Sequence, residues 1–331
     1  MKLDNKEFGF DNFSAEMAKL KNDQHFDYLV TIVGEDFGEE GLGCIYILEN
    51  TKNHERISVK QIAKKVGETD YVIPSVIKLW HDADLLEREV FDFLGIKFLG
   101  HPDMRRLFLR NDFEGYPLRK DFDMSPEHNR FPMTDEPESD WTSEWNLNQF
   151  GELVETKHRL FDTDDFVMNF GPNHPSMHGV LRLQTVVNGE TVKRIYPHLG
   201  YIHRGIEKMM ENMTYPQTLA LTDRLNYLCA MTNRHALVGV IEEAMGVELS
   251  DRIKYIRTIM DELQRIDNHL LFLGTCAQDL SALTAFLYCM RDREHVLNVM
   301  EETTGGRLIQ NYYRIGGLQA DIDPHFVENT K

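Results

Sequence analysis

Three long stretches of helical periodicity fill much of the second half of the chain. Residues 216–245, 250–280 and 284–303 carry apolar side chains at intervals of three and four. Gly246 follows the first stretch as a stop signal, and Ser250 precedes the second as an N-cap. Helices of this length bury one face each against their neighbours, so the pattern predicts a bundle of long helices.

A hairpin precedes the predicted bundle. The apolar runs at 180–187 and 190–199 flank Asn188 and Gly189. This pair suits a type I′ turn, in which both central residues have positive φ. We therefore expect two antiparallel strands that lead into the helices.

The first part of the chain has the short apolar runs of a sheet. β-Branched and aromatic residues at 27–33 and 43–48 predict two strands, which the Gly-rich, acidic segment 35–43 joins as a hairpin connection. Residues 55–63 could add a third strand. Helical spacing over 75–94 follows, so this part is a small domain of the β-β-α type.

The predicted helix over 75–94 has Ser75 as its possible N-cap and Gly95 as its stop. The charged residues within 87–93 and 117–122 are most simply interface or solvent-facing residues, because charged side chains are almost never fully buried unless they are paired. A small β-β-α domain followed by a hairpin and a long-helix bundle makes the predicted fold class α+β.

Length and charge limit what kind of protein this chain can be. Its 331 residues suggest two domains, which we place at 1–125 and 161–331 with an acidic linker or arm over 126–160. The 36 basic and 54 acidic residues give a net charge of −18, which repels a phosphate backbone, so nucleic acid is not expected as a partner. No apolar run reaches the ~18 residues of a transmembrane helix, and the N-terminus does not resemble a secretory signal.

The linker prediction rests on a sharp change of composition. Residues 132–155 contain seven acidic residues and no Lys or Arg, and two prolines interrupt any helix. Trp141 and Trp145 within it have the i, i+4 spacing of one helix face. Two interpretations stay open: the tryptophans pack on the chain's own surface, or they dock on a neighbouring protein.

The four cysteines are scattered singly. Cys44, Cys229, Cys276 and Cys289 form no C-x-x-C pair, which is typical of reduced thiols in a cytoplasmic protein. The chain therefore cannot hold an iron–sulfur cluster or a structural zinc by cysteine alone.

A constrained loop with two histidines is the first candidate for chemistry. Residues 171–179 contain His174 and His178 between two prolines and two glycines, which forbid regular helix. A metal site would need both imidazoles on one helix face, so positioned hydrogen-bond or proton donors are the better functional interpretation. A purely structural loop is the alternative.

Two further clusters lie on predicted helices. Arg224 and Tyr227 have i, i+3 spacing early in a helix, where an ordinary salt bridge beside a packed tyrosine is the structural alternative. The segment 265–269, with Asp279 further along the same helix, places ionisable residues among leucines. Such groups need partners when buried, so paired polar residues of the core are the alternative to a site.

These motifs together resemble two subunits of respiratory complex I, the proton-pumping NADH:quinone oxidoreductase. Residues 85–109 and 113–122 resemble the C, or 30-kilodalton, subunit. Other motifs resemble the D, or 49-kilodalton, subunit. In order along the chain they are GPNHPSMHGVLRL, YIHRGIEKM, LALTDRLNYL, QRIDNHLL, AQDLSALTAF and YYRIGG. The chain is therefore similar to a fused C/D subunit, and we expect it to be truncated within the D part.

The resemblance implies roles for individual residues. His178 and Tyr227 correspond to the residues that contact the quinone headgroup, and Asp279 to an aspartate that orients His178 and holds it cationic. Donors at the two carbonyl oxygens suit a reaction that ends with the uptake of two protons. These three residues are the predicted catalytic residues, and quinone is the predicted substrate.

The resemblance also implies the surroundings of the chain. Arg204, Arg224 and His269 correspond to residues near a [4Fe–4S] cluster that a partner subunit holds, so the chain binds no metal or cofactor itself. The implied partners are the cluster-bearing B and I subunits, the G subunit and the membrane H subunit. The implied location is the cytoplasmic face of the bacterial inner membrane, as a peripheral protein.

Two other functions stay open. The D subunit is similar to the large subunit of nickel–iron hydrogenases, which implies the same fold for the helical part. Where those enzymes have a metal-binding C-x-x-C pair, this chain has Asn226 and Cys229, and one thiolate cannot replace two. The third possibility is a docking scaffold without catalysis, because the first domain shows no catalytic cluster.

Overall fold

The computed structural model describes residues 4–125, 141–161 and 165–331. The chain divides into two compact units, Met1–Arg204 and Gly205–Lys331. The boundary between these units differs from the domain boundaries predicted at 125–126 and 160–161. The predicted boundaries separate the parts that resemble the C and D subunits, and they stay a prediction. Among the described residues, no helix is both long enough and apolar enough to cross a membrane.

A four-stranded sheet in the order β1-β4-β3-β2 opens the first unit, with the strands β1 (Asp4–Glu7), β2 (Tyr28–Asp36), β3 (Leu42–Asn50) and β4 (Glu55–Ile62). The strands β2, β3 and β4 pair antiparallel, whereas β1 runs parallel to β4. All three strands predicted here are therefore confirmed, and the acidic connection contains the short 3₁₀ helix η1 (Gly38–Glu40).

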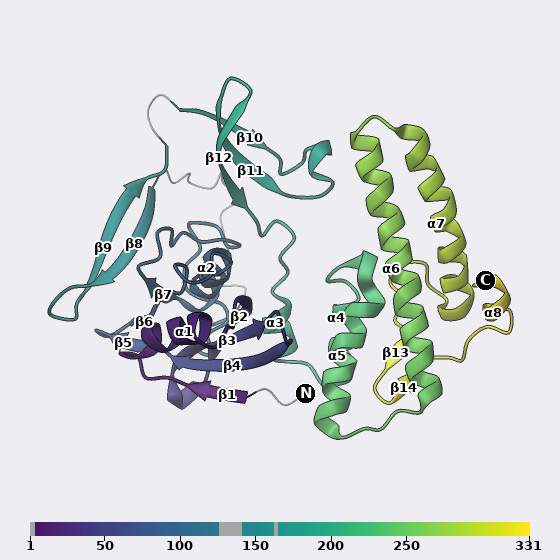
Figure 1. Cartoon of the computed structure of the whole chain (residues 1–331), viewed down its shortest axis with the longest axis horizontal. Coiled ribbons are helices and arrows are strands. Elements are labelled where there is room, and N and C mark those ends of the chain that lie inside the picture. The colour runs from purple at the N-terminus through teal and green to yellow at the C-terminus, as the bar shows by residue number, and fades with distance from the viewer. Residues whose placement is uncertain (1–3, 126–140, 162–164) are drawn as a thin grey trace. The chain divides into compact units, whose positions relative to one another are not determined.

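A second sheet has the order β5-β6-β7-β8-β9, with the strands β5 (Lys64–Val66), β6 (Asp70–Pro74), β7 (Ile96–Leu99), β8 (Trp141–Leu147) and β9 (Leu153–Arg159). Its last two strands form the antiparallel ribbon visible in Figure 1. Residues from the acidic stretch thus complete a sheet that the first part of the chain begins.

The strand β8 corrects the prediction for the two tryptophans. Trp141 and Trp145 lie on a strand and not on a helix face, because main-chain pairing with β7 and β9 decides the local conformation. Trp145 packs against the core of the first unit, with the Lys97 ammonium 3.7 Å from its ring centroid. The prediction that the tryptophans pack on the chain's own surface is confirmed for Trp145. The part of the predicted linker or arm over 126–140 lies outside the described residues. Residues 141–159 contain β8 and β9, and the linker or arm stays a prediction.

Two helices cover the sheets of the first unit, α1 (Phe13–Asn22) and α2 (Ala83–Leu94). The helix predicted from residue 75 begins only at Ala83, so Ser75 is not its N-cap. The reason is a competing contact, because the Ser75 hydroxyl donates to Glu87 Oε2 at 2.6 Å and residues 75–82 form turns instead. Gly95 ends α2 in the left-handed conformation, as predicted.

The predicted hairpin is present as β11 (Arg182–Asn188) and β12 (Thr191–His198), with β10 (Phe166–Phe170) on the other side of β11. Its turn differs from the predicted one. Asn188 pairs with Thr191, so the two central residues are Gly189 and Glu190, and of these only Gly189 has positive φ. The register of the two strands also shifts between Val186 and Val187, as at a β-bulge.

The end of the hairpin lies directly against the first part of the chain. Gly200 has φ +93°, and a Cβ atom there would be 2.0 Å from the carbonyl oxygen of Phe108. Only glycine fits this approach of two backbones. The His203 ring also stacks on Phe93, with ring centroids 4.9 Å apart. These contacts explain why the hairpin belongs to the first compact unit.

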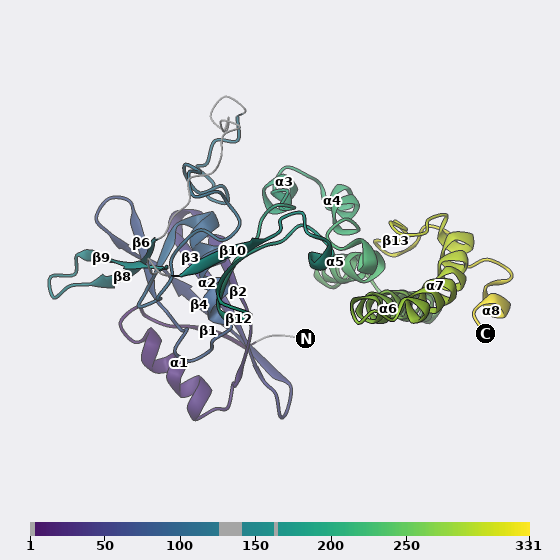
Figure 2. The ribbon, with the colours of Figure 1, turned by 90° about the horizontal axis from the view of Figure 1, so that it is seen from above.

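The second unit is mostly helical, with two short strands near its end. Its helices are α3 (Ile206–Met210), α4 (Tyr215–Thr222), η3 (Tyr227–Cys229), α5 (Ala230–Met245), α6 (Asp251–Asp279), α7 (Leu283–Thr304) and α8 (Phe326–Asn329). The strands β13 (Tyr313–Arg314) and β14 (Gly317–Leu318) form a small hairpin. Figure 2 shows α6 and α7 side by side.

The predicted helices over 250–280 and 284–303 are confirmed as α6 and α7, with Ser250 in the N-cap position and Gly246 ending α5. The stretch 216–245 is not one helix, because the chain leaves α4 at Asp223. The Asp223 carboxylate turns inward to Arg234, with 2.6 Å between Oδ1 and Nε, and both side chains are almost fully buried. This contact holds the chain in a break between two shorter helices.

Candidate functional site

The loop between β10 and β11 presents His178. The loop returns on itself through a bridge between Asn173 and Val180, and a Cβ on Gly171 would lie 1.9 Å from the Leu181 carbonyl oxygen. His178 has φ +48°, and its amide donates to the Pro175 carbonyl oxygen at 3.2 Å. The backbone is therefore tightly constrained while the imidazole is exposed.

Tyr227 lies in η3 and not on a regular helix, so the predicted shared face with Arg224 is wrong. The Asn226 side chain caps η3 by accepting from the Leu228 amide at 3.1 Å. The Arg224 guanidinium instead donates back to the Ala220 carbonyl oxygen at 2.6 Å. Tyr227 is 57% exposed, so its ring is available to a ligand and is not part of the core.

The turn that carries Tyr227 is fixed to α6. The Asn268 amide donates to the Cys229 sulfur at 2.8 Å. Asp279, the last residue of α6, lies about three turns beyond this contact, or about 16 Å along the helix axis. Tyr227 and Asp279 thus stand at two levels of one helix, and both are exposed.

The other predicted site residues are also at the surface. Arg204 is the exposed last residue of the first unit, and Arg224 and His269 are exposed in the second. His178 and Arg204 belong to one compact unit, and Tyr227, Asp279, Arg224 and His269 to the other.

The remaining polar residues of the 265–269 cluster are paired, as the structural alternative predicts. Asp267 is almost fully buried, with its Oδ1 2.8 Å from Arg293 Nε. Burial is the largest influence on this carboxyl and raises its pKa. Arg265 pairs with Glu262 on the exposed face of α6. Asp267 and Arg265 are therefore structural residues.

Comparison with known proteins gives matches to both parts of the chain. Residues 10–128 match the family described as respiratory-chain NADH dehydrogenase, 30 Kd subunit, and residues 279–331 match the 49 Kd subunit. The NADH-quinone oxidoreductase C/D subunit of Phocaeicola vulgatus is 54% identical over 316 residues, which is 96% of this chain and 60% of that protein. The C/D subunit of Bacteroides thetaiotaomicron is 52% identical over 326 residues, or 96% and 61%.

The chain belongs to the family of fused C/D subunits of NADH-quinone oxidoreductase. It spans about 60% of the length of these two relatives. A more distant member, the second C/D subunit of Aquifex aeolicus, is 40% identical over 92% of this chain and 53% of its own length. The resemblance stated from the motifs is thus confirmed.

Within the C-like part of the chain, the prediction of interface or solvent-facing charges is wrong for three residues of α2. In the segment 117–122, Lys120 and Asp121 are exposed, as predicted. Glu87 and Asp92 have no exposed surface and Arg88 is 5% exposed, so they are neither interface nor solvent-facing residues. Asp92 Oδ2 accepts from the amides of residues 107, 108 and 109 at 2.7 to 3.0 Å. Helical spacing indicates that Glu87 is buried, because it falls on the apolar face defined by Ala83, Val90 and Leu94.

All four cysteines of the chain are free thiols. Cys44 is buried in the first unit, and Cys229, Cys276 and Cys289 are separate free thiols of the second. Among the described residues, no group of three or more His, Cys, Asp or Glu side chains could hold a metal ion. An iron–sulfur cluster needs several thiolates at one place, so these cysteines do not fit one.

Proposed function

We propose that the chain forms part of the quinone-reduction site of an NADH:quinone oxidoreductase. The observation that carries this proposal is the contrast within the family motifs. Two of their acidic groups, Asp223 and Asp267, are buried in ion pairs, whereas Tyr227 and His178 are exposed on constrained turns. Rigid turns with exposed donors are typical of binding sites.

The proposed chemistry uses these donors at the two quinone oxygens. Reduction of a quinone to a quinol consumes two electrons and two protons, and negative charge develops on both oxygens. The Tyr227 hydroxyl donates a hydrogen bond to one oxygen, and a protonated His178 supplies a proton to the other. The second proton, taken up by the oxygen that Tyr227 contacts, comes from solvent. Asp279 acts through His178, whose cationic form it stabilises.

We further propose that the electrons come from a [4Fe–4S] cluster of a partner subunit. Arg204, Arg224 and His269 would lie near that cluster, where a positive charge or a donor raises its reduction potential. The proposal includes coupling to proton translocation, the B, I, G and H subunits as partners, and a peripheral location on the cytoplasmic face of the inner membrane. It also includes a hydrogenase-like fold of the hairpin and long-helix bundle over 161–331.

Tyr227→Phe in the assembled complex tests the quinone site. The change removes one hydroxyl from an exposed ring and leaves the turn intact, so quinone reduction should fall roughly a hundredfold, as for the loss of an oxyanion-type donor. Transfer of electrons from NADH to ferricyanide should be nearly unchanged, because that acceptor does not need the quinone site. Tyr255→Phe, at an exposed tyrosine of α6, is the matched control.

Wild-type rates of quinone reduction in Tyr227→Phe and His178→Ala, with normal assembly, would contradict the proposed site. The chain would then act as a docking scaffold for cluster-bearing subunits. Stoichiometric nickel in the purified chain would instead favour a hydrogenase-related protein.

A further inference from the structure

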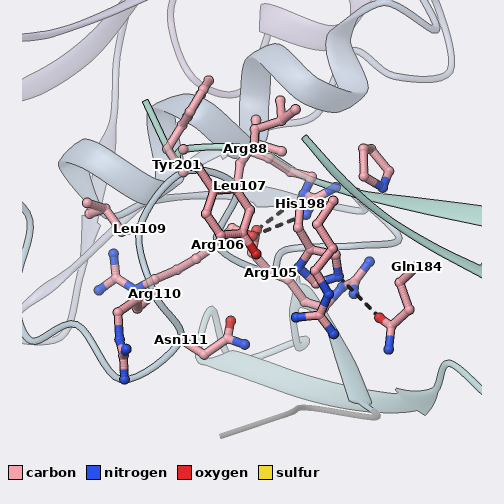
Figure 3. Close-up of a pocket in the computed structure, with 15 residues that line it drawn as sticks. Arg88, Arg105, Arg106, Leu107, Leu109, Arg110, Asn111, Gln184, His198 and Tyr201 are labelled. Carbon is pink, nitrogen blue, oxygen red and sulfur yellow. Dashed lines mark hydrogen bonds between the residues drawn. The ribbon is translucent and has the colours of Figure 1, made fainter. Parts of the chain in front are cut away.

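An arginine-lined cavity of about 340 Å³ lies within the first unit, between the loop over 105–111 and the hairpin of β11 and β12. Figure 3 shows side chains of this loop converging with Gln184 and His198 of the hairpin. No Asp or Glu is among its described lining residues, which include five arginines, Arg88, Arg105, Arg106, Arg110 and Arg182.

Buried hydrogen bonds fix the innermost arginines. Arg88 is 5% exposed, and its Nε and Nη2 donate to the carbonyl oxygens of Arg105 and Arg106 at 3.2 Å each. Arg106 donates to Asp92 Oδ1 at 2.9 Å. A ligand would therefore meet guanidinium groups that are already held in place, so little side-chain entropy is lost on binding.

Arg106 pairs with Asp92 and Arg110 pairs with Asp112, but two of the arginines share one carboxylate. Asp103 accepts two hydrogen bonds from Arg105, at 2.8 and 2.6 Å, and the same carboxylate is the ion-pair partner of Arg88 at 3.7 Å. One negative charge thus serves two guanidinium groups. Burial lowers the pKa of Arg88, which reflects the cost of holding this cation away from water.

The mouth of the cavity has the composition of a protein interface. Tyr201 lines it and is 46% exposed, and the adjacent Ile202 is 71% exposed. Tyrosine and arginine are the residue types enriched at binding hot spots, and an inorganic anion would gain nothing from exposed apolar side chains. The volume accommodates one or two side chains rather than a helix.

We propose that this arginine pocket docks an acidic segment of a partner subunit, whose Asp or Glu carboxylate enters the cavity while a neighbouring apolar residue packs on Tyr201. The inference rests on the proposed function, because it requires a multisubunit complex. A guanidinium fork binds a carboxylate through two parallel hydrogen bonds, which gives the contact both strength and a fixed orientation.

Zero-length cross-linking in the assembled complex tests the pocket. Arg182→Lys keeps the positive charge and introduces a primary amine. A carbodiimide then joins this amine to a carboxylate in contact with it: an amide bond forms, and the carbodiimide takes up the water as a urea. We expect mass spectrometry to find an amide between position 182 and an Asp or Glu of another subunit. Arg56→Lys is the positive control, since Arg56 pairs with Glu49 of the same chain.

Cross-links from position 182 that are confined to this chain, or no cross-link while the control reacts, overturn the pocket and leave the proposed function standing. A chain that copurifies with no other subunit overturns both. A second variant, Arg182→Glu, should weaken retention of the partner subunit roughly 30-fold or more, whereas Arg182→Lys should retain it. Equal retention in both variants, with unchanged thermal unfolding, also overturns the proposal.

Discussion

Glu87 shows how one buried carboxyl can organise a small domain. It accepts from the Ser75 hydroxyl and from the Val76 amide, at 2.6 and 2.8 Å, and so fixes the turn that precedes α2. The groups around it include Asp84, Cys44 and His101, whose Nε2 is 4.0 Å from Glu87 Oε2. Burial raises the pKa of Glu87 from the ordinary 4.5 to about 8.

This pKa predicts a loss of stability at alkaline pH. The folded first unit keeps a proton on Glu87 that the unfolded chain has already released. The contribution of Glu87 to the free energy of unfolding is therefore complete below pH ~4.5 and is lost as the pH rises through 8. Between pH 6.5 and 8.5 the free energy of unfolding should fall by about 2 kcal/mol. Urea denaturation, followed by the fluorescence of the buried Trp80, measures the effect.

Glu87→Gln should remove most of this dependence of the unfolding free energy on pH, because glutamine resembles the protonated acid and has no proton to release. Glu16→Gln, on the surface of α1, should keep the wild-type slope. A slope that is unchanged in Glu87→Gln would assign the pH dependence to other groups. Burial also lowers the pKa of His101 from its ordinary value of 6.5. The contribution of His101 to stability is therefore lost only as the pH falls below 6.5.

Asp92 is predicted to be the most sensitive carboxylate of the first unit. Asp92→Asn removes the charge that pairs with Arg106 and weakens three amide contacts, which should cost about 3 to 5 kcal/mol of unfolding free energy. Asp112→Asn, at the more exposed partner of Arg110, should cost less than about 1 kcal/mol. Similar losses of unfolding free energy in both variants would show that Asp92 stabilises the first unit no more than the more exposed Asp112 does.

Sequence patterns identify exposed functional candidates better than buried polar ones. His178 and Tyr227 stand out through motifs, but Glu87, Arg88 and Asp92 look like surface charges until their partners are known. Those partners lie 11 to 18 residues away in the sequence, as in the contacts to Val76 and Arg106. Such contacts form only when the turn before α2 and the loop after it fold against the helix. Helical spacing can indicate the buried face, but it does not reveal these partners.

At the scale of elements, long helices are predictable and breaks are not. The spacing of apolar residues suffices for α6 and α7, because each buries a continuous stripe. The break after α4 depends on Arg234, which donates to Asp223 and to the carbonyl oxygens of Leu219 and Tyr313. The strand β8 likewise depends on pairing with distant β7.

Arg234→Met should therefore destabilise the second unit more than any surface change does. The variant leaves Asp223 as a buried, unpaired carboxylate, which should cost about 3 to 5 kcal/mol. Arg265→Met, at an exposed pair on α6, should cost less than about 1 kcal/mol. Thermal unfolding followed by far-ultraviolet circular dichroism compares the two, and equal midpoints would contradict the assigned role of Arg234.

At the scale of the whole molecule, the two compact units predict two unfolding transitions. All three tryptophans, Trp80, Trp141 and Trp145, lie in the first unit, whereas the long helices lie in the second. Arg234→Met should thus lower the midpoint seen by circular dichroism and leave the midpoint seen by tryptophan fluorescence unchanged. Coincident shifts by both probes would mean that the units unfold as one.

The sheet that β8 and β9 complete has a consequence for how such a chain could arise from two genes. The stretch similar to the 30 Kd subunit ends at residue 128, yet the sheet gains its last strands from residues 141–159. Two polypeptides divided before Trp141 would meet by adding strands to an open sheet edge. Such a junction combines main-chain hydrogen bonds, as between the Gly100 amide and the Trp145 carbonyl, with the packing of Trp145 on the core of the first unit. Fusion then makes permanent, at the level of the gene, an association that the backbone already favours.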